Sequence, residues 1–177
     1  MMKYFVIILL FFGQCALAQS FDNSVSRNSI KANFSAKAIE AYEENSFSKV
    51  NDFYEFLEIY SDKNSSEALK NQVKENAFSL YKSNIEVTDF YSREKITLEK
   101  LFENIKEKGL KFEVKNIRKE MTSNSFWTNS YTLEIRNDAI TQTQKITQRI
   151  YFIPEEKSFG NKKKEVWTIL LADFELN

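Results

Sequence analysis

The sequence contains no histidine and only one cysteine, one proline and three glycines among its 177 residues. Histidine is the usual general base and metal ligand near neutral pH, so its absence excludes Ser-His-Asp and Cys-His catalytic sites and most zinc sites. The glycines stand at 13, 109 and 160, too far apart for a phosphate-binding loop or a dinucleotide fingerprint. Carboxylates and tyrosines remain as the candidates for acid–base chemistry.

The single cysteine, Cys15, lies in an N-terminal segment with the pattern of a secretory signal. Residues 1–18 combine a positive charge at Lys3, a short apolar run, and small residues at Ala16 and Ala18. This pattern predicts cleavage after Ala18, and the apolar run is shorter than the about 20 residues that a membrane-spanning helix needs. We therefore predict a periplasmic or secreted protein with no transmembrane span. The alternative, a lipid anchor at Cys15, is less favoured because the preceding residues depart from the lipoprotein pattern.

Charge is balanced at 25 basic and 25 acidic residues, so no electrostatic footprint for nucleic acid is present. The one dense basic run, residues 162–164, adjoins Gly160, and we expect a solvated hairpin loop there rather than a phosphate or lipid patch. Residues 19–29 are polar and aperiodic and are expected to form a flexible leader. Residues 30–177 show no linker and are predicted to form one domain.

The apolar pattern predicts helices first and strands afterwards. Helical spacing of apolar residues covers 30–44 and 48–61, and Asn64 with Glu67 offers a start for a third helix that ends near residue 82. A short β-branched and aromatic strand is expected over 85–91. Thr97 then caps a further helix, which Gly109 ends in a left-handed conformation.

From Gly109 onward the period of the apolar residues is two, which predicts four long antiparallel strands. The phase slips near Lys115-Asn116, where we expect a bulge, and turns are expected at Asn137-Asp138 and around Gly160. The last strand, 166–176, is apolar on both faces and is predicted to be a central strand. The expected fold is α+β: N-terminal helices packed on a curved antiparallel sheet of four long strands, plus a short strand.

This order of elements resembles the NTF2-like (cystatin-like α+β cone) superfamily over about 48–176. The segments that carry the resemblance are Phe53-Tyr54-x-Phe56-Leu57, VTDFYSREKITLEKLF at 87–102, and Trp167-Thr168-Ile169. The resemblance implies a cavity between the helices and the concave face of the sheet, and often a dimer through the outer face of the sheet. It does not imply one activity, because the superfamily includes isomerases, dehydratases, hydrolases and proteins without known catalysis.

Polar side chains interrupt the apolar rows that are expected to line this cavity. If Trp127, Tyr131, Leu133, Ile150 and Leu170 face inward, strand alternation places three polar residues inward with them. A buried amide without a partner costs about 1–3 kcal/mol, so such positions are often used for ligand contacts. The alternative is that they bond to one another, to water or to a helix end. The predicted ligand-binding residues are Asn129, Gln148, Thr168 and Tyr131.

For an enzyme, the resemblance suggests a carboxylate base and a tyrosine donor in an apolar cone. Asp89, Tyr91 and Tyr54 are the candidate catalytic residues, and Asp173 is a further carboxylate near the rim. Asp89 lies in an apolar segment, which is expected to raise the pKa of its carboxyl. The alternative is that Asp89 is a polar residue at the surface or at the end of the strand.

The face of the last strand opposite to Thr168 carries Trp167, Ile169 and Leu171. An exposed row of this kind would need a cover, and a homodimer through the sheet face would supply it. The alternative cover is a neighbouring loop or the 30–44 helix of the same chain.

These observations favour an exported, non-catalytic binding or assembly module of the bacterial cell envelope, without cofactor or metal. Its partner would be an envelope protein or a small apolar ligand. The alternatives are a cofactor-free cone enzyme of isomerase or hydrolase type and a purely structural dimer.

Overall fold

The computed structural model describes residues 34–123 and 126–177. The predicted signal segment with Cys15, and the predicted leader over 19–29, lie outside the described residues. Within them no helix has the length and apolar character to cross a membrane. The elements are, in chain order, α4 (Ala36–Ser61), α5 (Glu67–Leu80), β1 (Glu86–Thr88), β2 (Lys95–Thr97), α6 (Leu98–Ile105), β3 (Lys111–Thr122), β4 (Phe126–Arg136), β5 (Thr141–Phe159) and β6 (Lys162–Leu176).

The longest helix, α4, is one continuous helix of 26 residues where the sequence predicted two. It begins after Ser35, whose hydroxyl accepts a hydrogen bond from the Ala38 N–H at 3.2 Å. The polar residues between the two expected helices do not break it, because none is Gly or Pro and Ser46 donates its hydroxyl to the Glu43 carbonyl within the helix. The prediction of two helices was wrong for this reason.

The other two helices start at hydroxyl caps. The Thr97 hydroxyl accepts from the Lys100 N–H at 3.2 Å, which confirms the predicted start of α6. Helix α5 starts after Ser66 and not at Asn64, because the Ser66 hydroxyl accepts from the Leu69 N–H. Gly109 has φ +62°, which confirms its predicted left-handed conformation. The prediction that Gly109 ends the helix was wrong, because α6 already ends at Ile105 and Glu107, with φ +60°, is the first left-handed residue after it.

Gly109→Ala is expected to lower the free energy of unfolding by about 1 kcal/mol, because a left-handed backbone is unfavourable for any residue with a Cβ. A Cβ at this position would meet no atom within 4 Å. The loss of stability would therefore come from the backbone conformation and not from a steric clash. Urea unfolding of the variant beside the wild type measures it. Asn116→Gly is the reciprocal control, since Asn116 has φ +56° and should gain stability or stay unchanged. Equal stability of Gly109→Ala and the wild type would contradict the left-handed conformation of Gly109.

As predicted, the four long strands form one antiparallel sheet, and their order is β3-β4-β5-β6. The predicted bulge is confirmed by the register shift between Lys115 and Arg118. The predicted turn at Asn137 is confirmed by its side-chain oxygen, which accepts from the N–H groups of Ala139 and Ile140. The fold class, helices packed against an antiparallel sheet, is therefore confirmed.

Strand β6 lies at the edge of this sheet, so its prediction as a central strand was wrong. The segment that follows α5 covers the free edge of β6. The Lys82 N–H donates to the Leu171 carbonyl at 2.9 Å, and the Thr88 hydroxyl donates to the Phe174 carbonyl at 3.0 Å. The predicted strand over 85–91 is shorter than expected and forms a hairpin with β2, which the sequence did not predict.

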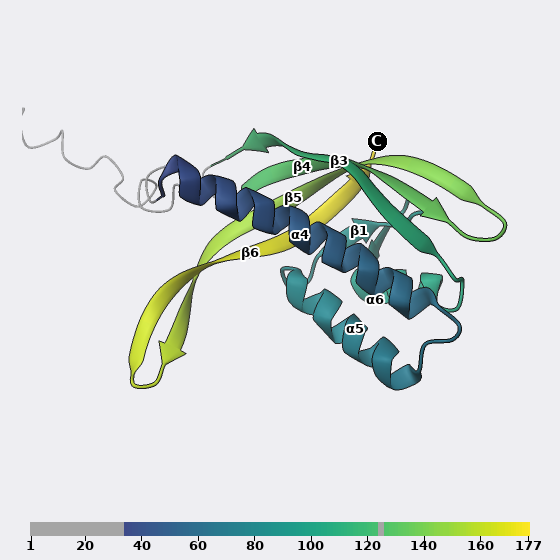
Figure 1. Cartoon of the computed structure of the whole chain (residues 1–177), viewed down its shortest axis with the longest axis horizontal. Coiled ribbons are helices and arrows are strands. Elements are labelled where there is room, and N and C mark those ends of the chain that lie inside the picture. The colour runs from purple at the N-terminus through teal and green to yellow at the C-terminus, as the bar shows by residue number, and fades with distance from the viewer. Residues whose placement is uncertain (1–33, 124–125) are drawn as a thin grey trace, which may run out of the picture.

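Helix α4 lies across the concave face of the sheet (Figure 1). Strand β4 alternates as predicted, and its buried row is Trp127, Asn129, Tyr131, Leu133 and Ile135. Strand β6 has the opposite phase to the prediction. Ile169 and Leu171 are buried on the inner side, whereas Thr168 bonds to Glu155 and faces outward. A strand that is apolar on both faces has no alternation from which its phase could be predicted.

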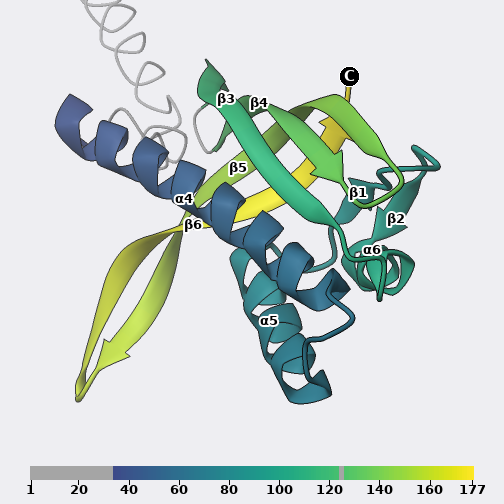
Figure 2. The ribbon, with the colours of Figure 1, turned by 45° about the vertical axis from the view of Figure 1, so that its right-hand side comes forward.

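The hairpin of β5 and β6 extends beyond the rest of the sheet as an arm (Figures 1 and 2). Strand β4 pairs with β5 only as far as Phe126 opposite Tyr151, whereas β5 and β6 remain paired to Phe159 opposite Lys162. The outer part of the arm is therefore a two-stranded ribbon without a third strand.

Candidate functional site

Three tyrosines and one glutamine form a buried hydrogen-bonded chain between α4 and the sheet. The hydroxyls of Tyr54 and Tyr131 are 2.9 Å apart, and Tyr131 donates to Gln148 Oε1 at 3.0 Å. Gln148 Nε2 in turn donates to the Tyr81 hydroxyl at 3.1 Å and to the Ala172 carbonyl at 3.4 Å. Because Tyr131 gives its proton to Gln148, Tyr54 must be the donor to Tyr131. We call these four side chains the tyrosine network: Tyr54, Tyr81, Tyr131 and Gln148.

Burial keeps the tyrosine network uncharged. It raises the pKa of the Tyr54 hydroxyl far above its usual range, although the hydrogen bond with Tyr131 opposes the shift. Burial also raises the pKa values of Tyr81 and Tyr131 well above normal. The hydroxyls are therefore neutral at any physiological pH and serve as hydrogen-bond partners rather than as bases.

The structure brings together only part of the predicted ligand-binding set. Tyr131 and Gln148 share the tyrosine network, but their polar atoms face partners within the protein. Asn129 is separate and donates to the Ser46 hydroxyl at 3.0 Å. Thr168 lies on the other face of the sheet and donates to the Glu155 carboxylate.

Asp89 holds the turn that joins β1 to β2. One carboxylate oxygen accepts from the N–H groups of Tyr91 and Ser92, both at 2.8 Å, and the other accepts from Asn104 Nδ2 at 2.8 Å. Burial by itself would raise the pKa of this carboxyl, but the hydrogen bonds from Ser92, Asn104 and Tyr91 outweigh it and lower the pKa. The predicted rise in pKa was wrong, because the sequence does not show the donors.

The three candidate catalytic residues do not share a site. Tyr54 is buried in the tyrosine network, whereas the Tyr91 side chain is exposed and lies beside Lys108, whose Nζ is 4.6 Å from the ring centre. Among the described residues no hydrogen bond joins the Asp89 carboxylate to either tyrosine side chain, since its contact with Tyr91 is to the backbone. The remaining carboxylate, Asp173, pairs with Arg149 at 3.3 Å.

The predicted interface row lies on the inner face of β6 and not on an open face. Ile169 and Leu171 are part of the core, and the ring of Trp167 packs against Phe152 and Phe34 at 4.8 and 5.3 Å between ring centres. The cover is thus the start of α4 together with Phe34 before it, the alternative given above. The outer face of the sheet is lined by paired charges, among them Lys115 with Glu134 at 2.7 Å. The placement of this row on an open face was wrong.

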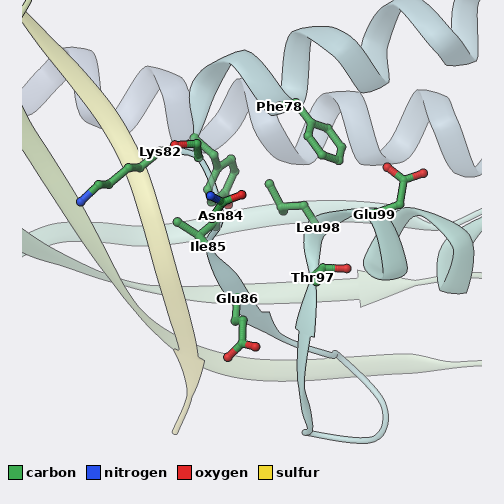
Figure 3. Close-up of a pocket in the computed structure, with 10 residues that line it drawn as sticks. Phe78, Lys82, Asn84, Ile85, Glu86, Thr97, Leu98 and Glu99 are labelled. Carbon is green, nitrogen blue, oxygen red and sulfur yellow. The ribbon is translucent and has the colours of Figure 1, made fainter.

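A pocket of about 530 Å³ opens on the surface where the C-terminal end of α5 meets β1 and the start of α6 (Figure 3). In Figure 3, Phe78 of α5 and Leu98 of α6 face each other across it, and the Lys82 side chain points away. Phe78 is 37% exposed, so an apolar surface is accessible there. The lining residues are Phe78, Tyr81, Lys82, Ser83, Asn84, Ile85, Glu86, Thr97, Leu98 and Glu99.

Two further depressions continue this pocket. One shares residues 82–86 with it and extends to Tyr151 and Asp173 of the sheet, and the other shares Phe78 and Glu99 and extends along α5 to Lys74. The combined surface has an apolar floor with charges of both signs at its rim. We call it the α5 groove. The volume of the pocket at its centre lies within the range of about 300–1,000 Å³ that is usual for ligand sites.

Sequence reasoning did not predict the α5 groove. Phe78 and Ile85 have no distinctive spacing, and Leu98 lies on the buried side of its helix. The groove exists because α5, the 82–86 segment and α6 converge, which is a property of the tertiary structure. Tyr81 was not among the predicted site residues, although a hydroxyl at a buried position is a signal that a polar partner is required.

Within the described residues, no three histidine, cysteine, aspartate or glutamate side chains come together in a group that could hold a metal ion. No family model matches the sequence, and no curated protein matches it either.

Proposed function

We propose that this protein is an exported, non-catalytic binding or assembly module with an NTF2-like arrangement, and that it holds an apolar group of its partner in the α5 groove. The observation that carries the proposal is the contrast between a filled interior and an accessible groove. The partner is a small apolar ligand or an apolar side chain of an envelope protein.

The filled interior argues against a ligand inside the cone. Aromatic rings occupy the space between α4 and the sheet: Phe53 packs against Tyr81 at 4.8 Å, and Phe90 stacks on Phe174 at 5.8 Å between ring centres. The polar atoms of the tyrosine network already have protein partners, so a ligand would have to displace satisfied hydrogen bonds.

The surroundings of Asp89 argue against the enzyme alternative. A general base should have a pKa near the working pH and an accessible lone pair, whereas the pKa of Asp89 is lowered and both its oxygens accept bonds from the turn and from Asn104. Its nearest tyrosine, Tyr91, is exposed. These features suit a structural carboxylate.

The NTF2-like arrangement is supported by the order of elements and by the position of β1. Two helices, a hairpin and a third helix precede the four long strands. The segment from Tyr81 to Thr88 runs beside β6, with Tyr81 and Leu171 in parallel pairing.

Anilinonaphthalene sulfonate, a dye that fluoresces on apolar surfaces, tests the groove. Phe78→Ser is expected to weaken dye binding about tenfold, because one side of the apolar floor is lost. Leu69→Ser is the matched control: Leu69 lies on the same helix and is 41% exposed, but it lines none of the three depressions. Equal binding by wild type and Phe78→Ser, or an equal loss in both variants, would contradict the proposal.

A further inference from the structure

The end of the β5–β6 arm combines an exposed aromatic ring with a concentration of positive charge. Phe159 is 55% exposed, the highest value among the exposed large apolar residues of the described chain. Residues 157–164 carry four lysines and no carboxylate: Lys157, Lys162, Lys163 and Lys164. The carboxylates of the arm, Glu155, Glu156 and Glu165, lie one or two residue pairs closer to the body. The charges of the arm are thus segregated, with the basic end outermost (Figure 1).

The ion pairs of the arm leave half of this charge uncompensated. Lys163 pairs with Glu156 at 2.7 Å, and Lys157 lies 3.7 Å from Glu155. Lys162 and Lys164 form no ion pair within the described part of the chain. Lys157 and Lys164 also stand directly opposite each other on the two strands. Like charges in that position destabilise a hairpin, and a two-stranded ribbon is marginally stable without further support. The lysines of the tip therefore destabilise the arm when nothing else contacts it.

We infer that the arm tip is a membrane-contact site for the surface of an anionic bilayer, in contrast to the solvated loop that we expected from the sequence. Lysines attract anionic headgroups, and an aromatic ring between them can enter the membrane–water interface. The two interactions together bind a bilayer more strongly than either one alone. The depression beside the tip is lined by Glu156 and Glu165 as well as by Lys163 and Lys164, so its carboxylates would repel a free phosphate ion. A flat anionic surface, in contrast, can meet the lysines and the ring together and relieve the repulsion between Lys157 and Lys164.

The residues at the free edges of the arm favour membrane contact over pairing with a strand of another molecule. The free edge of β5 in the arm includes Pro154, which has no N–H to donate, and the free edge of β6 begins with three lysines. Proline and lysine at edges are features that oppose edge-to-edge pairing. The end of the arm is then the part available for contact.

A tryptophan reporter at the tip tests the contact directly. In the full chain, Phe159→Trp is expected to shift its emission to shorter wavelength with phosphatidylcholine vesicles that contain phosphatidylglycerol, and not with pure phosphatidylcholine vesicles. The emission change of the wild-type chain is subtracted, because Trp127 and Trp167 also emit. Ile140→Trp is the matched control. Ile140 is 50% exposed at the turn before β5, the opposite end of the strand that Phe159 ends, and it has no lysine run beside it.

Charge reversal tests the electrostatic part. Each lysine near an anionic surface strengthens binding roughly fivefold, so Lys162→Glu, Lys163→Glu and Lys164→Glu together should weaken vesicle binding, read from the Phe159→Trp reporter, by about 100-fold or more. Added salt should weaken it as well.

Three results would overturn the inference: no shift at position 159 with anionic vesicles, the same shift at position 140, or the same shift with uncharged vesicles. The reporter reads the tip itself, so a membrane contact elsewhere in the chain does not imitate the expected result. Lysine-dependent self-association without a lipid response would assign the tip to a second copy of the chain and would also overturn it.

Discussion

Gln148→Leu is expected to lower the free energy of unfolding by about 3 kcal/mol, the largest effect that we expect from a single substitution at the predicted site. Leucine is one atom shorter and apolar, and it can neither accept from Tyr131 nor donate to Tyr81. At least one tyrosine hydroxyl then has no acceptor, and the Ala172 carbonyl loses a donor. Each unpaired buried group costs about 1–3 kcal/mol.

Thr168→Val is the matched control, because the sequence places Thr168 and Gln148 in the same predicted set. Thr168 lies on the outer face, so its loss should change stability by no more than about 0.5 kcal/mol. Urea unfolding measures both variants. If the tyrosine network is a unit, Tyr131→Phe will cost less in the Gln148→Leu background than in the wild type. Equal costs in the two backgrounds would show that the hydrogen bonds are independent.

Asp89→Ala is expected to lower the free energy of unfolding by about 2–3 kcal/mol at neutral pH. Two backbone N–H groups and the Asn104 amide lose a charged acceptor, and the turn between β1 and β2 loses its anchor. The same turn places Phe90 in the core, so the damage extends beyond the loop.

The contribution of Asp89 should depend on pH with a defined sign. Its pKa is lower in the folded protein than in the unfolded chain. The stabilisation is therefore complete above the unfolded value of about 4 and is lost as the pH falls through the lower folded value. The stability difference between wild type and Asp89→Asn should be constant from pH 7 to 5 and shrink below about pH 4. Asp138→Asn, an exposed carboxylate at another turn, controls for the loss of one charge. If the stability difference between wild type and Asp89→Asn grew as the pH fell, the pKa of Asp89 could not be lowered in the folded protein.

Two of the predicted functional residues, Tyr131 and Gln148, lie in one buried site, and the reason is visible in the sequence. Their positions on β4 and β5 alternate with apolar residues, and strand alternation fixes which face each side chain occupies. What they bond to was not predictable, because Tyr54 and Tyr81 come from helical and loop segments 77 and 67 residues away.

The error on β6 has a different origin. The run VWTILLA offers apolar residues to both faces, so the alternation that fixed β4 and β5 carries no information there. The face was decided by the register with β5, where Ile150 pairs with Leu171, and by the cover that Phe34 supplies to Trp167. The predicted interface row then became part of the core.

Local chemistry by itself determined the elements of this protein: a hydroxyl before a helix at Thr97, a left-handed glycine at 109, a bulge at Asn116, and alternation along β4. These features depend on interactions within a few residues, which the sequence states directly. Tertiary structure alone decided the phase of β6, the donors around Asp89, and the meeting of α5, the 82–86 segment and α6 at the groove. Each of these depends on contacts between residues far apart in the chain, and such contacts are selected by the packing of the whole domain.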